Sequence, residues 1–192
     1  MVVDPRNLNQ IMLAEGKEKV NTHKELFSTK IIAEIAVFVS AATVLSTIKI
    51  GLPQEGSVTA GSMVPIFWLS LRRGPKVGLF AATLYGVVQL ALGPYIVNPI
   101  QVLLDYPVAF GLLGVAGFFQ KQPYVGITLG IAGRFFAHFV SGVVYFSSFA
   151  PEGMSPLVYS AVYNGSYLII EFMITVYIIF LLRMSKVFEM YM

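Results

Sequence analysis

The stretch PLVYSAVYNGSYLIIEFMITVYIIFLLR, residues 156–183, decides the class of this protein. Its one charged side chain before the closing Arg183 is Glu171. A helix needs about 20 mostly apolar residues to cross the hydrocarbon core of a bilayer. The stretch therefore predicts a membrane-spanning helix.

Five apolar segments precede it, at about 30–50, 63–72, 76–93, 99–119 and 124–147. The second is too short to cross ~30 Å of hydrocarbon alone. It either extends into the loop before it or packs inside the bundle. We predict an all-α integral membrane protein, a six-helix transmembrane bundle. Residues 1–29 form a polar cytoplasmic segment, with a short surface helix at about 7–20, and residues 30–192 form the membrane domain.

Composition supports this class. Of the 192 residues, 56% are hydrophobic and only 12% are charged, about half the charged share of a soluble domain. The chain has no cysteine, which excludes disulfides and thiolate metal sites. It also lacks a phosphate-binding G-x-x-x-x-G-K-[ST] loop and the H-E-x-x-H and G-x-S-x-G motifs. His23 and His138 fall on different segments, so we expect no metal, no cofactor and no catalytic residue.

Basic residues collect in alternate loops, which orients the bundle. They occur in the turn 72–76, at Lys121 and in the tail with Arg183 and Lys186, whereas loops 51–62, 93–98 and 148–155 contain neither Lys nor Arg. The positive-inside rule then places both termini in the cytoplasm. Lys49, near the outer end of the first helix, is the exception and can snorkel. The basic residues behind the net charge of +3 thus orient the protein in the plasma membrane and do not indicate a nucleic-acid partner.

Ionisable residues inside a bilayer are costly and are candidates for function. Four residues spaced four apart share one face of the fifth helix: Arg134, His138, Gly142 and Phe146. At a similar depth near the outer face lie Tyr95, Asp105, Tyr106, Tyr159 and Asn164. We expect one outward-facing cavity for a small polar aromatic ligand, with aromatic rings for stacking and Asp105 for a positive charge.

Simpler interpretations stay open. The outer tyrosines suit a membrane-interface belt, and Arg134 suits a direct ion pair with Asp105. An intramembrane histidine such as His138 often only joins two helices. Glu171 lies deep in the last helix without an obvious partner.

One side of the first helix carries small side chains. Ala36 and Ser40 are four apart, a spacing that lets another helix approach closely. The partner is either a helix of this bundle or a separate membrane subunit.

Several motifs, in order, resemble one family. They are 53–59 with 63–67 and 72–74, then 101–106, Arg134 to Gly142, 148–153, and Tyr159 to Gly165. Over residues 30–183 the chain resembles the thiamine-specific substrate-binding (S) component of energy-coupling-factor vitamin transporters. Where that family more often has glutamate, lysine and tryptophan, this chain has Asp105, Arg134 and Phe146.

The resemblance implies a six-helix fold that binds thiamine near the outer face. It assigns ligand contacts to Asp105, Tyr106, Tyr95, Arg134, His138, Gly142, Phe146, Tyr159 and Asn164, and to Gly56 and Ser57 in the loop above the pocket. It implies docking through Ala36 and Ser40 to a transmembrane coupling subunit, which acts with two ATP-binding subunits. Binding of another vitamin or a thiamine precursor, and an intramembrane enzyme using Asp105 and His138, remain as alternatives.

Overall fold

The computed structural model describes residues 28–51 and 56–185. The surface helix expected at 7–20 lies outside these residues, as do both termini. The chain divides into two units, Met1–Glu34 and Ile35–Met192, and only residues 28–34 of the first are described. The predicted boundary between residues 29 and 30 stays a prediction. The architecture below is that of the second unit.

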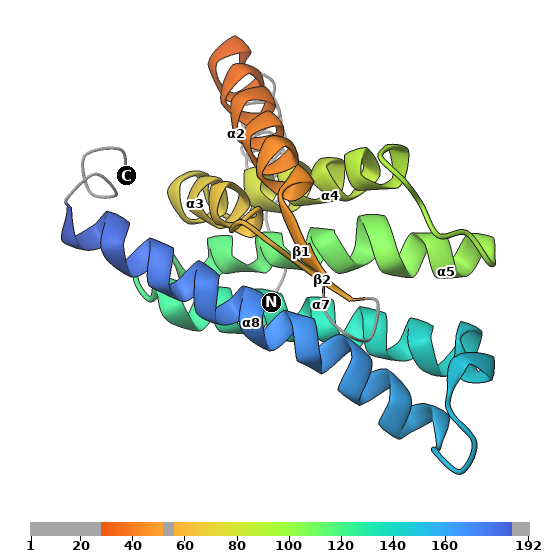
Figure 1. Ribbon diagram of the computed structural model, residues 1–192. Helices are drawn as coiled ribbons and strands as arrows, with labels where there is room; N and C mark the ends of the chain where they lie inside the picture. Colours follow the sequence, from red (N-terminus) through yellow and green to blue (C-terminus); the bar gives the residue numbers. More distant parts are fainter. Residues whose placement is uncertain (1–27, 52–55, 186–192) are drawn as a thin grey trace, which may run out of the picture. The chain divides into compact units, whose positions relative to one another are not determined.

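Six helical segments lie where the sequence predicts them (Figure 1). Five are regular helices: α2 (Thr29–Thr47), α3 (Met63–Arg73), α4 (Pro75–Ala91), α7 (Pro123–Tyr145) and α8 (Pro156–Met184). The sixth is composite: α5 (Pro99–Leu103), a π-helical turn η1 (Leu104–Val108), α6 (Ala109–Gly111) and a 3₁₀ stretch η2 (Leu112–Phe119). Within the described residues, α2, the 99–119 segment, α7 and α8 are long and apolar enough to cross a membrane, and α4 is shorter.

A small β-hairpin after α2 corrects the predicted end of the first helix. The helix stops at Thr47 and does not reach residue 50, because the backbone of β1 (Lys49–Gly51) pairs with β2 (Ser57–Thr59) in antiparallel register. The Ile-Lys-Ile run at 48–50 suits a strand better than a helix end. Lys49 is therefore an exposed strand residue.

The short helix α3 is an interior element. Most of its side chains are buried, including Met63, Ile66, Phe67 and Leu69. The segment before it is the strand β2, so α3 does not extend backward as a helix. Of the two explanations for its length, packing inside the bundle is correct.

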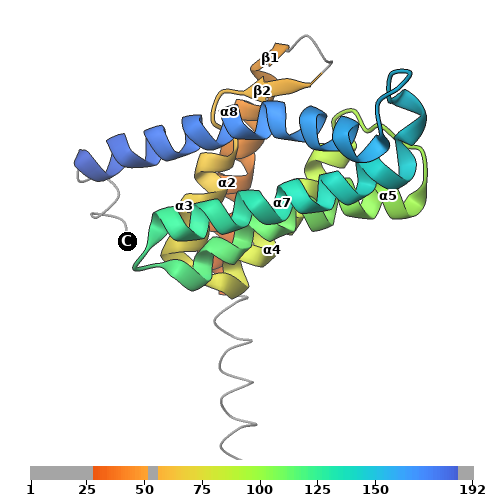
Figure 2. The same ribbon diagram turned by 90° about the horizontal axis from the view of Figure 1, so that it is seen from below.

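The 99–119 segment is central to the packing. Its η2 part contacts α3, α4 and α7, and α7 in turn packs along α8 (Figure 2). Glycine makes this closeness possible, because a Cβ on Gly114 would collide with the backbone of Gly78 and Leu79 in α4.

The basic turns share one end of the bundle, as predicted. The Gln120 side chain donates to the carbonyl of Leu71 over 2.9 Å, which joins the turn after η2 to the last turn of α3. The guanidinium of Arg183, in the last turn of α8, lies 5.7 Å from the centre of the Tyr124 ring in the first turn of α7. At the other end, Tyr95 contacts the rings of Phe146 and Phe149.

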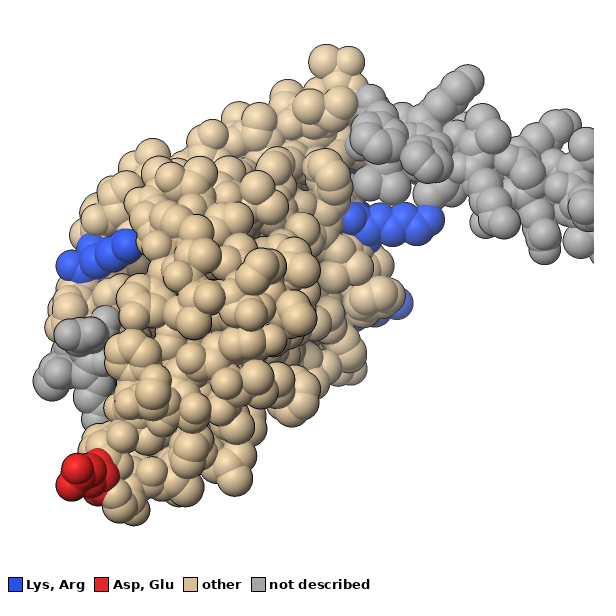
Figure 3. Space-filling view, turned by 90° about the vertical axis from the view of Figure 1, so that its right-hand side faces the viewer, with Lys and Arg blue, Asp and Glu red and all other residues tan. Residues whose placement is uncertain are grey.

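The outer surface is suited to lipid. On the face shown in Figure 3, charged side chains are few and lie toward the margins. Large apolar side chains are exposed along every long helix, for example Val37 and Val44 on α2 and Met173 and Tyr177 on α8. This pattern is expected where hydrocarbon and not water surrounds the helices.

Candidate ligand-binding site

A cavity of about 830 Å³ lies within the second unit, toward the end opposite the basic turns. This volume falls in the roughly 300–1,000 Å³ range of small-molecule pockets. All residues predicted to bind a ligand line it: Gly56, Ser57, Tyr95, Asp105, Tyr106, Arg134, His138, Gly142, Phe146, Tyr159 and Asn164. The structure thus brings the predicted residues together, and ligand contact itself stays a prediction.

Asp105 occupies the π-helical turn η1 together with Tyr106 and Pro107. Proline has no N–H, so it cannot make the regular helical hydrogen bond at this point. Single π turns widen a helix locally and are frequent at functional sites.

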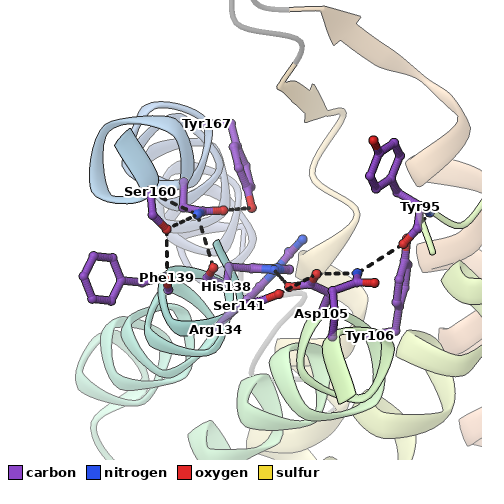
Figure 4. Close-up of polar contacts among 11 residues, drawn as sticks. Tyr95, Asp105, Tyr106, Arg134, His138, Phe139, Ser141, Ser160 and Tyr167 are labelled. Atoms are coloured by element: carbon purple, nitrogen blue, oxygen red, sulfur yellow. Dashed lines mark hydrogen bonds and ion pairs between the residues drawn. The ribbon is translucent and has the colours of Figure 1, made fainter. Parts of the chain in front are cut away.

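Three donors hold the Asp105 carboxylate (Figure 4). Oδ1 lies 3.0 Å from Nδ1 of His138, and Oδ2 accepts from Gln101 Nε2 at 2.7 Å and from Ser141 Oγ at 2.9 Å. Such a network keeps the side chain in one orientation. The carboxylate remains partly accessible, at 15% side-chain exposure.

The hydrogen bonds define the tautomer of His138. Nε of Arg134 is 3.3 Å from Nε2 of His138, and a guanidinium can only donate. Nε2 therefore accepts, and Nδ1 carries the proton that it donates to Asp105. This arrangement makes His138 a neutral bridge between one cation and one anion.

Arg134 and Asp105 are linked through His138 and not by the direct ion pair considered from the sequence. Nη1 of Arg134 is 3.0 Å from Sδ of Met63, and its guanidinium carbon is 4.1 Å from the centre of the Phe110 ring. The arginine therefore lies against an aromatic face and a thioether, one helical turn before the histidine on α7. Among the described residues, Asp105 meets this pair through the hydrogen bond from neutral His138 and not through the guanidinium.

Gly142 lets α7 and α8 approach each other. A Cβ at this position would collide with the side chain of Ser160 and lie 3.4 Å from Nδ2 of Asn164. The Asn164 amide donates to the carbonyls of Ser160 (3.0 Å) and His138 (3.3 Å), and its Oδ1 accepts from the Tyr167 hydroxyl (3.0 Å). Asn164 on α8 thus forms a hydrogen bond to α7, and its side-chain carbonyl oxygen can accept one further hydrogen bond.

Aromatic rings surround the outer part of the cavity. The Tyr95 ring centre is 5.6 Å from that of Phe146, and the Tyr159 and Tyr163 centres are 6.0 Å apart. Tyr95 is 56% exposed, in keeping with an interface belt. Both Tyr95 and Tyr159 also line the cavity, so belt position and ligand contact are compatible.

The sequence prediction missed several polar residues of the site. Gln101 is buried and ties the loop before α5 to Asp105, because its amide also donates to the Tyr95 carbonyl and accepts from the Val97 amide. Its position four residues before Asp105 was the available signal. Ser141, which stands in no G-x-S-x-G motif, donates to Oδ2 of Asp105. Glu171, left without a partner, accepts hydrogen bonds from Thr59 of β2.

The two residues predicted for docking lie on the outer surface of the bundle. Ala36 and Ser40 are exposed on α2, whereas Ile35, Val39, Ala42 and Ser46 form its buried face. The interpretation that these small residues pack against a helix of this bundle is therefore wrong. Docking to another subunit stays a prediction.

Apolar helices around an aromatic and charged cavity define a helical membrane protein that binds a small ligand. The profile of the family described as "Thiamine transporter protein" matches residues 32–189. The chain belongs to this family, a multi-pass family of the plasma membrane whose named function is transport and not catalysis.

Similar proteins agree with this assignment. The chain is 36% identical to the thiamine transporter ThiT of Bacillus subtilis, over 79% of this chain and 89% of the relative. It is 30% identical to ThiT of Lacticaseibacillus paracasei, over 82% and 87%. The solved structure of ThiT from Listeria monocytogenes matches with a TM-score of 0.76 and 28% identity, covering 82% of this chain and 96% of that chain.

Proposed function

We propose that this protein captures thiamine from the outer side of the membrane and serves as the substrate-binding component for its uptake. One observation carries the proposal. In a chain of the thiamine transporter family, the cavity contains a partly buried charge network, Arg134–His138–Asp105, beside a set of aromatic rings.

The chemistry of thiamine suits these groups. Its thiazolium ring carries a permanent positive charge, which favours aromatic faces and carboxylates in a low-dielectric site. Tyr95, Phe146 and Tyr159 offer the faces. The aminopyrimidine ring has donors and acceptors at its edge, and Asn164 and the Arg134 guanidinium retain hydrogen-bonding capacity for them.

Energy for uptake must come from elsewhere, because the sequence has no phosphate-binding loop. We propose docking to a transmembrane coupling subunit that works with two ATP-binding subunits. The exposed small residues Ala36 and Ser40 support this partner. In a bilayer, close helix approach depends on small residues and not on hydrophobicity.

Isothermal titration calorimetry on the purified protein in detergent tests the ligand. Thiamine should bind with a dissociation constant well below that of its free pyrimidine precursor, and riboflavin should not compete. Tight binding of the precursor or of riboflavin, with weak binding of thiamine, would replace thiamine by that ligand. Recovery of unaltered thiamine after incubation would confirm binding without reaction.

A further inference from the structure

The deep part of the cavity contains a carboxylate outside the Asp105 network. Glu171 lines the cavity and is only 3% exposed. It is seven residues beyond Asn164 on α8, a separation of about 10 Å along the helix axis. The cavity therefore has two acidic positions at different depths, Asp105 and Glu171.

The two oxygens of Glu171 differ in their surroundings. Oε1 accepts from the backbone N–H of Thr59 at 2.6 Å and from its hydroxyl at 2.7 Å. Oε2 is buried and has no hydrogen-bond partner among the described residues. A buried carboxylate oxygen without a partner is costly, so its retention points to a partner that the bound state supplies.

The balance of buried charge indicates what this partner is. Among the Lys, Arg, Asp and Glu residues that line the cavity, Lys49 is exposed, and the interior ones are Asp105, Arg134 and Glu171. Arg134 and Asp105 are joined through His138 and offset each other. One carboxylate remains, and one monovalent cation would balance it. Uncompensated charge is expensive in a low-dielectric interior.

We propose that Glu171 is a second anionic anchor of the site and supplies the charge that selects a cationic ligand. This inference rests on the proposed binding of thiamine and adds a residue that determines specificity. The charged nitrogen of a thiazolium ring is bonded to three carbons and has no N–H to donate. It therefore needs a carboxylate for electrostatic stabilisation, and not a hydrogen-bond acceptor in a fixed direction.

The experiment compares two ligands of nearly equal shape. One is thiamine, and the other is its neutral thiophene analogue, in which carbon replaces the charged nitrogen. Glu171→Gln keeps an oxygen for Thr59 and removes the charge. It should weaken thiamine binding about 10- to 100-fold and change binding of the neutral analogue by less than about threefold, as measured by calorimetry.

Thr175→Val is the matched control. Thr175 lies one turn further along α8, is fully buried and does not line the cavity. Its hydroxyl makes no hydrogen bond to a described residue, so valine replaces it at equal size. Both ligands should bind this variant within about twofold of the wild-type affinity.

Three results would overturn the inference. The first is thiamine binding to Glu171→Gln within twofold of wild type. The second is an equal loss for both ligands, which would restrict Glu171 to supporting β2 through Thr59. The third concerns Glu171→Asp, the variant to use if glutamine prevents folding: its retained charge should keep the preference for thiamine within about threefold, and loss of that preference contradicts a charge-based role. Wild-type protein that does not bind thiamine would instead overturn the proposed function, and this inference with it.

Discussion

Asp105 accepts three of the site's hydrogen bonds, from His138, Gln101 and Ser141. Asp105→Asn keeps the shape but offers one acceptor oxygen where the aspartate offers two, so an NH₂ group must face His138 or the Gln101–Ser141 pair. We expect weaker thiamine binding by about 1–3 kcal/mol and a lower unfolding temperature. Calorimetry and thermal unfolding in detergent measure both, with Thr175→Val as the control. A binding curve that overlays wild type would remove Asp105 from the site.

Tyr106 offers a milder test of the same turn. Its hydroxyl oxygen accepts from the backbone N–H of Tyr95 at 2.9 Å, which holds the loop before α5 over the cavity. Tyr106→Phe keeps the ring and removes the acceptor. The expected loss of thiamine affinity is about 0.5–1.5 kcal/mol, the usual net value of one hydrogen bond. A loss as large as that of Asp105→Asn would mean that the hydroxyl contacts the ligand directly.

Single residues show how far sequence reasoning reaches. The spacing of Arg134, His138 and Gly142 correctly placed them on one face of α7, because helical periodicity fixes angular position. Phe146 also lines the cavity, although the helix ends at Tyr145 and not at residue 147 as predicted. The partner of Arg134 was not predictable. Which residue meets Asp105 depends on the rotation of α7 against the 99–119 segment, and that rotation follows from packing. His138, one turn after Arg134 on α7, takes the direct contact with Asp105.

At the level of elements, the contact between α7 and α8 depends on Gly142. A methyl group there would collide with Ser160, whose hydroxyl is bonded to the Phe139 carbonyl at 2.9 Å and cannot easily move away. Gly142→Ala should separate the helices, destabilise the fold by about 1–3 kcal/mol and weaken thiamine binding. Thermal unfolding and calorimetry give the two numbers.

Gly165→Ala is the control for this helix pair. Its Cβ would meet only Phe135, at 3.8 Å, which is ordinary contact distance. Alanine there should leave stability and binding unchanged or slightly improved, because alanine favours the helix. Equal behaviour of the two alanine variants would show that close helix approach at Gly142 is not required.

Elements were predictable where hydropathy decides them and less so elsewhere. Six helical segments followed from apolar length. The hairpin β1–β2 could not be predicted in this way. Its two strands have three residues each, 49–51 and 57–59, which is too short to show the alternation of apolar and polar residues that marks a strand. The π turn at 104–108 was marked only by Pro107, which is equally compatible with a kink. Irregular backbone inside a membrane is tolerated where it lines a cavity, as it does here.

For the whole molecule, the remaining question is how binding is coupled to uptake. The cavity end and the basic end are opposite, and α2 exposes Ala36 and Ser40 on its side. Lipid tails are as apolar as leucine, so a surface for another helix is distinguished by shape and not by hydrophobicity. Replacing both residues by leucine should therefore leave the isolated protein unaffected and block only the approach of a partner.

The double variant Ala36→Leu/Ser40→Leu tests this expectation. Purified protein should bind thiamine within about twofold of wild type and unfold at the same temperature, because neither side chain packs in the bundle. Thiamine uptake by cells and co-purification with the proposed coupling subunit should both be lost. Val37→Leu is the control, since Val37 is 65% exposed on α2 and leucine adds only one methylene group there, and it should transport normally. Normal uptake by the double variant would place the docking surface elsewhere, whereas equal loss in the control would indicate that any enlargement of α2 disturbs assembly.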